Sequence, residues 1–234
     1  MGDRERAQKC YKAGVSAVEN KNWDYAIEMF GICVKEVPEF LNYRQLLRGN
    51  LYKKYNDNKT GAGMMGKTKL ISIRSQVKKA KSKELWDEMD RACEEGLLIN
   101  PWDAQLNVEL GESAMQREYY DIAEFAYSCA VNADPKNKDL LIKLGDAFET
   151  RAKYDEAQKV WKRICDLDPS DGAARSKLTA LHAKKVTVKG GYEGADSTKD
   201  VMSALSPEEI AKRLNTTKHG GGAAGPGMDK EADL

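Results

Sequence analysis

One proline-ended segment recurs along this chain at a fixed interval, and that interval constrains the fold more than any other feature. The segment Asn132-Ala-Asp-Pro135 closes one copy, and its counterparts end at Pro101 and Pro169, 34 residues away in each direction. A fixed step of this size is typical of stacked repeats, in which each unit buries its apolar face against the next. The sequence therefore predicts a repeat array.

Four units agree with this step, and they cover residues 7–40, 70–103, 104–137 and 138–171. The seventeenth residue of each unit is aromatic and is followed by aspartate; these pairs are Trp23-Asp24, Trp86-Asp87, Tyr120-Asp121 and Tyr154-Asp155. An acidic residue in the first turn of a helix stabilises the unpaired amides there. We therefore expect the second helix of each unit to begin near these aspartates. The first half of each unit also has helical apolar spacing, so each unit is predicted to be a helical hairpin.

The units resemble the tetratricopeptide repeat (TPR). Its consensus has small residues at the eighth and twenty-seventh places and alanine at the twentieth. It has an aromatic residue at the twenty-fourth place and proline at the thirty-second. The third unit matches with Gly111, Ala123, Tyr127, Ala130 and Pro135, and the first with Gly14, Ala26, Phe30, Cys33 and Pro38. The fourth matches with Gly145, Ala157, Trp161 and Pro169 but has Ile164 at the small place. The second departs most, with Val77, Met89 and Cys93, and is identified mainly by Trp86-Asp87, Gly96 and Pro101. The resemblance implies an all-α solenoid of helical hairpins that binds proteins and is not an enzyme.

An insertion, residues 41–69, separates the first and second units. Its apolar residues Tyr43, Leu47, Leu51 and Tyr55 recur every fourth residue, which predicts one extra amphipathic helix over residues 39–55. Residues 56–66 are rich in glycine and asparagine and are expected to form a mobile loop. We expect the extra helix to be unpaired and to break the alternation of the stack.

Beyond the fourth unit, residues 172–186 are predicted to form the capping helix of the array, so that the solenoid spans residues 1–186. Eight of the 19 glycines lie in the remaining residues, and 187–234 are expected to form a flexible tail. Within it, Ser206 and Pro207 suit the start of a short helix over residues 206–215, which either docks elsewhere or frays.

Charge and composition exclude several classes of protein. The 38 basic residues balance the 37 acidic ones to a formal net charge of +1, which argues against nucleic acid as the partner. No segment approaches the ~20 apolar residues that a membrane span needs. The N-terminal residues show no secretory signal pattern. We therefore expect a soluble cytoplasmic protein.

The cysteine pattern argues against a disulfide framework and against a zinc site. The chain has an odd number of cysteines, no CxxC pair and only two histidines, His182 and His219. The cysteines, most of them at apolar positions of the periodic pattern, are Cys10, Cys33, Cys93, Cys129 and Cys165. We expect them to be small core residues, and we expect no metal and no cofactor.

A basic stretch, residues 67–83, carries seven lysines and arginines and no acid. Three of them, Arg74, Lys78 and Lys81, take the fifth, ninth and twelfth places of the second unit, which in TPR proteins look into the groove. Acidic residues follow at the same places of later units, so we predict a groove that runs from basic to acidic and suits a peptide or protein with its own charge pattern. The predicted groove residues are Tyr11, Arg74, Lys78, Lys81, Val108, Glu112, Met115, Ile142, Asp146 and Glu149. The lysine and asparagine with which some TPR proteins clamp a partner's C-terminal carboxylates are missing here, so that mode of binding is not carried over.

One string of residues in the insertion matches the sequence pattern of a nucleotide-binding site. Gly61, Gly66, Lys67 and Thr68 satisfy the pattern GxxxxGK[ST] of phosphate-binding loops. Such a loop follows a strand, whereas the polar residues before Gly61 predict none, so we expect a flexible loop that fits the pattern by accident. Two alternatives stay open: a nucleotide-binding switch or NTPase that uses this string, and an RNA or anionic-surface adaptor that uses residues 67–83.

Overall fold

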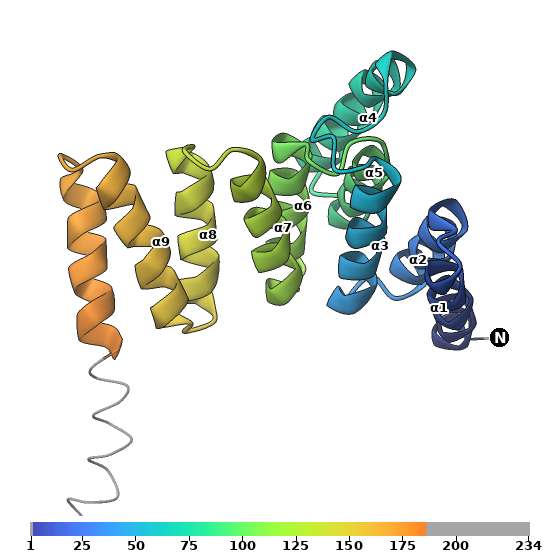
Figure 1. The fold of residues 1–234 in the computed structure, drawn as a ribbon. Helices are drawn as coiled ribbons and strands as arrows, with labels where there is room; N and C mark the ends of the chain where they lie inside the picture. The colour runs from blue at the N-terminus through green and yellow to red at the C-terminus, as the bar shows by residue number, and fades with distance from the viewer. Residues whose placement is uncertain (1, 186–234) are drawn as a thin grey trace, which may run out of the picture. The chain divides into compact units, whose positions relative to one another are not determined.

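The computed structural model describes residues 2–185, and all regular structure in that range is helical (Figure 1). The helices are α1 (Asp3–Glu19), α2 (Trp23–Glu36), α3 (Leu41–Lys54), α4 (Met64–Ser82), α5 (Trp86–Ile99), α6 (Ala104–Gln116), α7 (Tyr120–Ala133), α8 (Lys138–Thr150), α9 (Tyr154–Leu167) and a last helix over residues 172–185. The residues up to His182 form one compact unit. The predicted tail and its short helix at 206–215 lie outside the described residues. The all-α fold class predicted from the sequence is confirmed.

Each predicted repeat unit contains one helical hairpin. The pairs are α1 with α2, α4 with α5, α6 with α7, and α8 with α9. The second helix of each pair begins at the predicted aromatic residue. The turn before it holds one residue with left-handed φ, between 53° and 60°, always at the fifteenth place of the unit; these residues are Lys21, Glu84, Glu118 and Ala152. The TPR-type architecture is therefore confirmed, and the weakly matching second unit keeps the common register.

Glycine at the eighth place packs against the aromatic ring at the twenty-fourth. A Cβ added to Gly111 would lie 2.5 Å from the Tyr127 ring, and one added to Gly14 would lie 2.8 Å from the Phe30 ring. A real Cβ cannot approach a ring so closely, so the absence of a side chain lets the two helices of the hairpin meet over the ring.

In the second unit the volumes at these two places are exchanged. Val77 stands where the other units have glycine, and Cys93 stands where they have an aromatic residue. Both side chains are buried in the same apolar cluster. A larger side chain on the first helix and a smaller one on the second fill the same space, so this unit is packed although its consensus is lost.

The insertion contributes a helix with a partner. α3 packs against α2, and its Leu47 and Leu51 join the apolar cluster that contains Phe30. The prediction that this helix is unpaired is wrong, because α3 takes the place beside α2 that the first helix of the next unit occupies in a regular stack.

The segment between α3 and α4 is shorter and better held than the sequence predicts. α4 begins at Met64, so the connection spans residues 55–63 and Gly66 lies within the helix. The Asn58 side chain accepts hydrogen bonds from the N–H groups of Thr60 (2.9 Å) and Gly61 (2.8 Å). The Ala62 N–H donates to a carbonyl at the end of α5. The expected mobile loop is thus tied to α5.

The apolar core is divided into three clusters. The first lies among α1, α2 and α3, the second among α4 to α7, and the third among α6 to α9 and the last helix. Ala174 and Leu181 of the last helix are buried in the third cluster and cover its end. α3, in the first cluster, and α5, in the second, are joined by charged side chains.

Candidate functional site

Three of the predicted groove residues meet at one hollow between α4 and α6. The hollow measures about 350 Å³ and is lined by Arg74, Val77, Lys78, Lys81, Gln105, Leu106 and Glu109. Its walls therefore combine cationic side chains with the apolar side chains of Val77 and Leu106. Lys78 is exposed and has no ion-pair partner within residues 2–185.

The other two cations of the hollow are bound to α6 and its N-terminal cap. The ammonium group of Lys81 donates to Glu109 Oε2 (2.9 Å) and Glu112 Oε2 (2.7 Å). Partial burial alone would lower the pKa of Lys81, but these hydrogen bonds outweigh it and raise the pKa. Arg74 donates to Asp103 Oδ2 (2.5 Å), and Oδ1 of the same carboxylate accepts the N–H of residue 106 at the start of α6. Lys78 is thus the groove cation of α4 whose charge is free for a partner.

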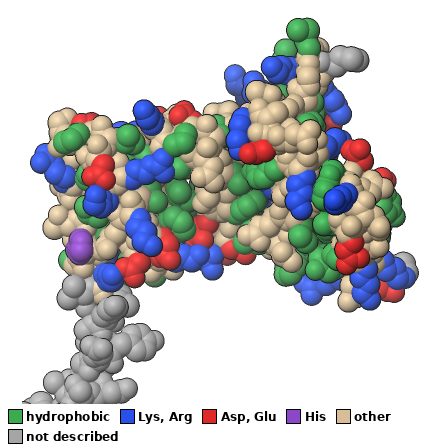
Figure 2. Space-filling model, in the orientation of Figure 1, with side chains coloured by type: hydrophobic (Ala, Val, Ile, Leu, Met, Phe, Trp, Pro, Cys, Tyr) green, Lys and Arg blue, Asp and Glu red, His purple; other side chains and the backbone are tan. Residues whose placement is uncertain are grey.

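The acidic end of the predicted groove is also partly neutralised. Lys177 of the last helix lies 3.0 Å from a carboxylate oxygen of Glu149 and 3.5 Å from one of Asp146. The hydrogen bond to Glu149 raises the pKa of Lys177. Figure 2 shows acidic and basic side chains intermixed on the visible face. The predicted change from a basic to an acidic surface is therefore weaker than the sequence indicates.

The sequence reasoning missed Glu109 and Lys177, although a signal for both exists. Each takes the sixth place of its unit, counted from residues 104 and 172, and each pairs with the twelfth place of the unit before it. The twelfth-place partners are Lys81 and Glu149, so the two pairs have opposite polarity. The signal is the opposite charge of the sixth place in one unit and the twelfth place in the unit before it.

The uncharged groove candidates are more enclosed than expected. Val108 is only 5% exposed and belongs to the core, so its assignment to an open groove is wrong. Tyr11 is half-buried, and its ring centroid lies 5.9 Å from that of Tyr43 in α3. Met115 and Ile142 are half-buried against the third apolar cluster. Only part of each of these three side chains is therefore exposed to a partner.

Two of the three glycines in the phosphate-loop string, Gly61 and Gly66, lie in close contacts, whereas a Cβ on Gly63 would meet nothing within 4 Å. Gly61 has φ of 71°, and a Cβ there would lie 2.3 Å from the Ile99 carbonyl oxygen. A Cβ on Gly66 would lie 2.6 Å from Cβ of Ala62 and 3.0 Å from Cγ2 of the same isoleucine. Close packing thus accounts for Gly61 and Gly66, the two glycines that the GxxxxGK[ST] pattern requires.

Two backbone N–H groups and the threonine hydroxyl of this string form hydrogen bonds inside α4. The N–H groups of Gly66 and Lys67 donate to the Gly63 carbonyl at 3.0 and 3.2 Å, and the Thr68 hydroxyl donates to the Met64 carbonyl at 3.3 Å. A phosphate-binding loop needs such amides free and a strand before them. No strand occurs in the described part of the chain.

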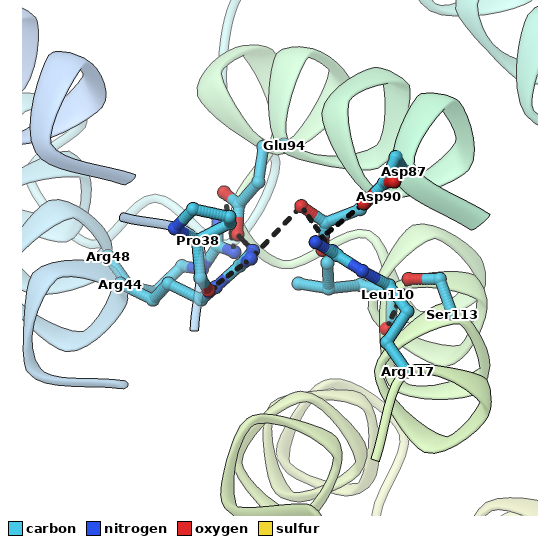
Figure 3. Close-up of polar contacts among 9 residues, drawn as sticks. All are labelled: Pro38, Arg44, Arg48, Asp87, Asp90, Glu94, Leu110, Ser113 and Arg117. Atoms are coloured by element: carbon cyan, nitrogen blue, oxygen red, sulfur yellow. Dashed lines mark hydrogen bonds and ion pairs between the residues drawn. The ribbon is translucent and has the colours of Figure 1, made fainter. Parts of the chain in front are cut away.

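A layer of buried charges joins α3 to α5. This buried charge layer consists of Arg44, Arg48, Asp90, Glu94 and Arg117, and Figure 3 shows the two α3 arginines facing the two α5 carboxylates. Arg44 donates to Glu94 Oε1 (2.8 Å) and Asp90 Oδ2 (3.0 Å). It also donates twice to the Pro38 carbonyl, at 3.2 and 2.8 Å. One guanidinium thus connects the chain just after α2 with α5.

Arg48 and Arg117 are bound less completely in this layer. Arg48 Nη2 lies 3.3 Å from Glu94 Oε2, and its Nε and Nη1 are buried with no hydrogen-bond partner in the described structure. Arg117 lies 3.5 Å from Asp90 and 2.6 Å from the exposed Asp87. Arg44 therefore contributes most of the specific contacts.

The two carboxylates of the layer titrate differently. Burial raises the pKa of Asp90 above its usual value, and Arg44 compensates only in part. Burial also acts to raise the pKa of Glu94, but the charges and hydrogen bonds of Arg48 and Arg44 outweigh it and hold the pKa below its usual value. Glu94 is thus kept ionised as the anion between two guanidinium groups.

The described residues show neither a cluster of metal-binding side chains nor a disulfide. No group of three or more metal-binding side chains lies close enough together to hold an ion there. Cys33, Cys93 and Cys129 are buried, and desolvation by burial raises the pKa of Cys33 to about 12, which keeps it a thiol. Among residues 2–185, no helix is both long and apolar enough to cross a membrane.

Known proteins resemble this chain in fold only. No protein-family model matches it, and no curated protein matches it. The first TPR domain of Spaghetti (RPAP3), solved with the HSP90 peptide SRMEEVD, is 18% identical over 51% of this chain and 94% of that one, with a TM-score of 0.46. The Yersinia enterocolitica type III secretion chaperone SycD, in complex with a peptide of the translocator YopD, is 16% identical over 50% of this chain and 95% of that one, with a TM-score of 0.46. The MamA protein is 14% identical over 86% of this chain and 97% of that one, with a TM-score of 0.42. At these values the comparisons say nothing about what this chain binds.

Proposed function

We propose that this chain is a non-catalytic scaffold that binds a segment of a partner protein along its inner helices, centred on α4 and α6. The observation that carries the proposal is the hollow of about 350 Å³, where the unpaired charge of Lys78 lies beside the apolar side chains of Val77 and Leu106. A partner segment with an acidic side chain next to an apolar one complements these walls in charge and in polarity.

The other groove residues extend this surface along the stack. Glu112, Asp146 and Glu149 are engaged in ion pairs with lysines of neighbouring units, so their charges contribute less to a partner than Lys78 does. Met115 and Ile142 add apolar edges between them. The hollow is therefore expected to dominate the affinity, and the later units to lengthen the contact.

A charge reversal in the hollow tests the proposal. Peptides selected from a displayed library on the full chain are titrated against Lys78→Glu and against Lys79→Glu. The second variant is the matched control, because Lys79 is the next residue of α4 and lines a different surface with Lys83 and Glu88. Lys78→Glu should weaken binding by about tenfold or more, whereas Lys79→Glu should leave it unchanged.

The helical signal of both variants must match that of the parent chain, because both lysines are exposed and unpaired within residues 2–185. Equal affinities of the two variants for the selected peptides would remove the hollow from the proposal. A loss of affinity by Lys79→Glu alone would place the contact on the other side of α4.

A further inference from the structure

α4 is covered on one side only. In the array α6 packs against both α5 and α7, and α8 packs against both α7 and α9, whereas the main packing partner of α4 is α5. The cause is the insertion, because α3 occupies the place beside α2. Figure 1 shows the first turns of α4 reaching beyond the ends of the neighbouring helices. A helix that is normally enclosed in such a stack therefore has a free face.

Two large apolar side chains lie on this free face. Met64 is 85% exposed and Ile71 is 70% exposed, the highest values among the large apolar residues of the described chain. They are seven residues, or two helical turns, apart and so lie on one stripe. The outer stripe of α4 is defined by Met64, Lys67, Ile71, Ser75 and, at its edge toward α5, Lys79, which are all exposed. Figure 2 shows hydrophobic and basic side chains together at this projecting end.

The outer stripe is cationic and has no acidic residue of its own. α4 contains no aspartate or glutamate. Lys67 and Lys79 are exposed and have no ion-pair partner in the described part of the chain, whereas Lys69, on the flank next to α5, lies 3.0 Å from a carboxylate oxygen of Glu95. Unpaired lysines beside exposed apolar side chains suit a surface on which anionic groups cover an apolar layer.

We propose that the outer stripe of α4 docks on an anionic lipid surface. Met64 and Ile71 enter the headgroup region, where their exposed apolar area leaves water. Lys67 and Lys79 contact the anionic headgroups around them. A single RNA strand would use the same charges, but RNA-binding surfaces add aromatic side chains that stack on bases, and α4 has none. The exposed apolar pair therefore favours lipid over RNA.

Vesicle binding by the full chain tests this proposal. Vesicles of phosphatidylcholine with phosphatidylserine are compared with vesicles of phosphatidylcholine alone, and the bound fraction is measured by flotation. The chain should bind only the vesicles with phosphatidylserine, and less of it as salt is added. The double variant Lys67→Glu, Lys79→Glu should bind at least about tenfold more weakly, because each basic residue near an anionic surface contributes about fivefold.

Two further variants separate the apolar and the charge contributions. Ile71→Ser should lower binding several-fold while the salt dependence stays, because it removes apolar area and no charge. Lys143→Glu, at an exposed lysine of α8 that is also unpaired within residues 2–185, should bind as the parent chain does.

The proposal is overturned by no binding to either vesicle, by equal binding to both, or by equal losses in the α4 and Lys143 variants. Binding that is insensitive to Ile71→Ser also contradicts it, as does affinity for a ribo-oligonucleotide without affinity for vesicles. Lys78 of the hollow follows Ile71 by seven residues and so borders the outer stripe, but the vesicle variants leave every residue that lines the hollow unchanged, and the peptide and vesicle experiments are therefore read separately.

Discussion

The hairpins from α6 to α9 and the junction from α3 to α5 solve the same packing problem in different ways. In the hairpins, a glycine on the first helix faces a large ring on the second, as Gly111 faces Tyr127 and Gly145 faces Trp161. At the junction, two arginines of α3 face two carboxylates of α5 in the buried charge layer. The hairpin contact thus depends on complementary shape, and the junction contact depends on opposite charge.

The comparison teaches how this array tolerates an inserted helix. The contacts between a glycine and an aromatic ring in the hairpins use positions that recur every 34 residues. α3 lies outside this repeat, so contacts of this kind cannot join it to α5. Charged side chains are long and directional, and their hydrogen bonds specify one arrangement where no repeat pattern does. Buried ion pairs add little net stability compared with an apolar contact, so we expect the junction to be specific but vulnerable to the loss of one partner.

The largest expected effect comes from breaking the buried charge layer. Arg44→Met removes the guanidinium group that Asp90 and Glu94 share and leaves Glu94 with Arg48 alone, and it should lower the free energy of unfolding by about 3–5 kcal/mol. Arg48→Met is the matched control on the same helix, because Arg48 contacts one carboxylate only, at 3.3 Å, and Arg44 still neutralises that carboxylate in the variant; it should cost no more than about 2 kcal/mol. Urea denaturation followed by circular dichroism measures both. Equal losses would show that Arg44 has no special place in the layer.

The glycine contacts of the hairpins should break with a smaller effect. Gly111→Ala puts a Cβ into the Tyr127 ring, and overpacking should exceed the gain in helix propensity to give a net loss of about 1–2 kcal/mol. Gly49→Ala in α3 is the control, because a Cβ there meets nothing within 4 Å. That variant should gain about 0.5–1 kcal/mol. Thermal unfolding distinguishes the two, and a gain in both would contradict the close contact.

The exchanged volumes of the second unit can be tested by restoring the consensus. Cys93→Phe alone should overpack against Val77, whereas Cys93→Phe combined with Val77→Gly should recover part of the loss. A double-mutant cycle should give a favourable coupling of about 1 kcal/mol. Additive effects of the two substitutions would mean that these places do not meet in the second unit.

The smallest expected effect is a change in the pH dependence of stability. The folded pKa of Glu94 is lowered from 4.5, so its contribution is fully present above pH 4.5 and is lost as the pH falls through the lower folded value. Glu94→Gln should be less stable at neutral pH but should lose less stability on acidification than the parent chain. Asp90 has a raised folded pKa, so Asp90→Asn should change the slope in the opposite direction. Slopes measured by urea denaturation between pH 3 and 6, roughly the range in which carboxylates titrate, are the readout. The same slope in all three proteins would contradict these shifts.

The repeat hairpins could be predicted because their signals are local. The aromatic residue and aspartate at the seventeenth and eighteenth places locate each second helix within a few residues. The glycine and ring contacts follow from spacings inside one unit. Arg74, Lys78 and Lys81 were likewise predicted to share a face, and they line one hollow.

The junction could not be predicted because its contacts are distant in the sequence. Arg44 meets Asp90 and Glu94 across 46 and 50 residues. In a sequence, an arginine usually indicates a solvent-exposed face of a helix. Arg44 and Arg48 instead lie on the same side of α3 as the buried Leu47 and Leu51. The place of α3 and the free face of α4 both depend on this contact, so they were missed with it.

Hydrogen exchange of the Arg44→Met variant tests the central claim most directly, namely that the buried charge layer joins the inserted helix to the rest of the array. The account predicts that backbone amides of α1, α2, α3 and α5 lose protection, while those of α8 and α9 keep the protection of the parent chain. Unchanged protection in α1 to α3, or an equal loss throughout α1 to α9, would contradict it.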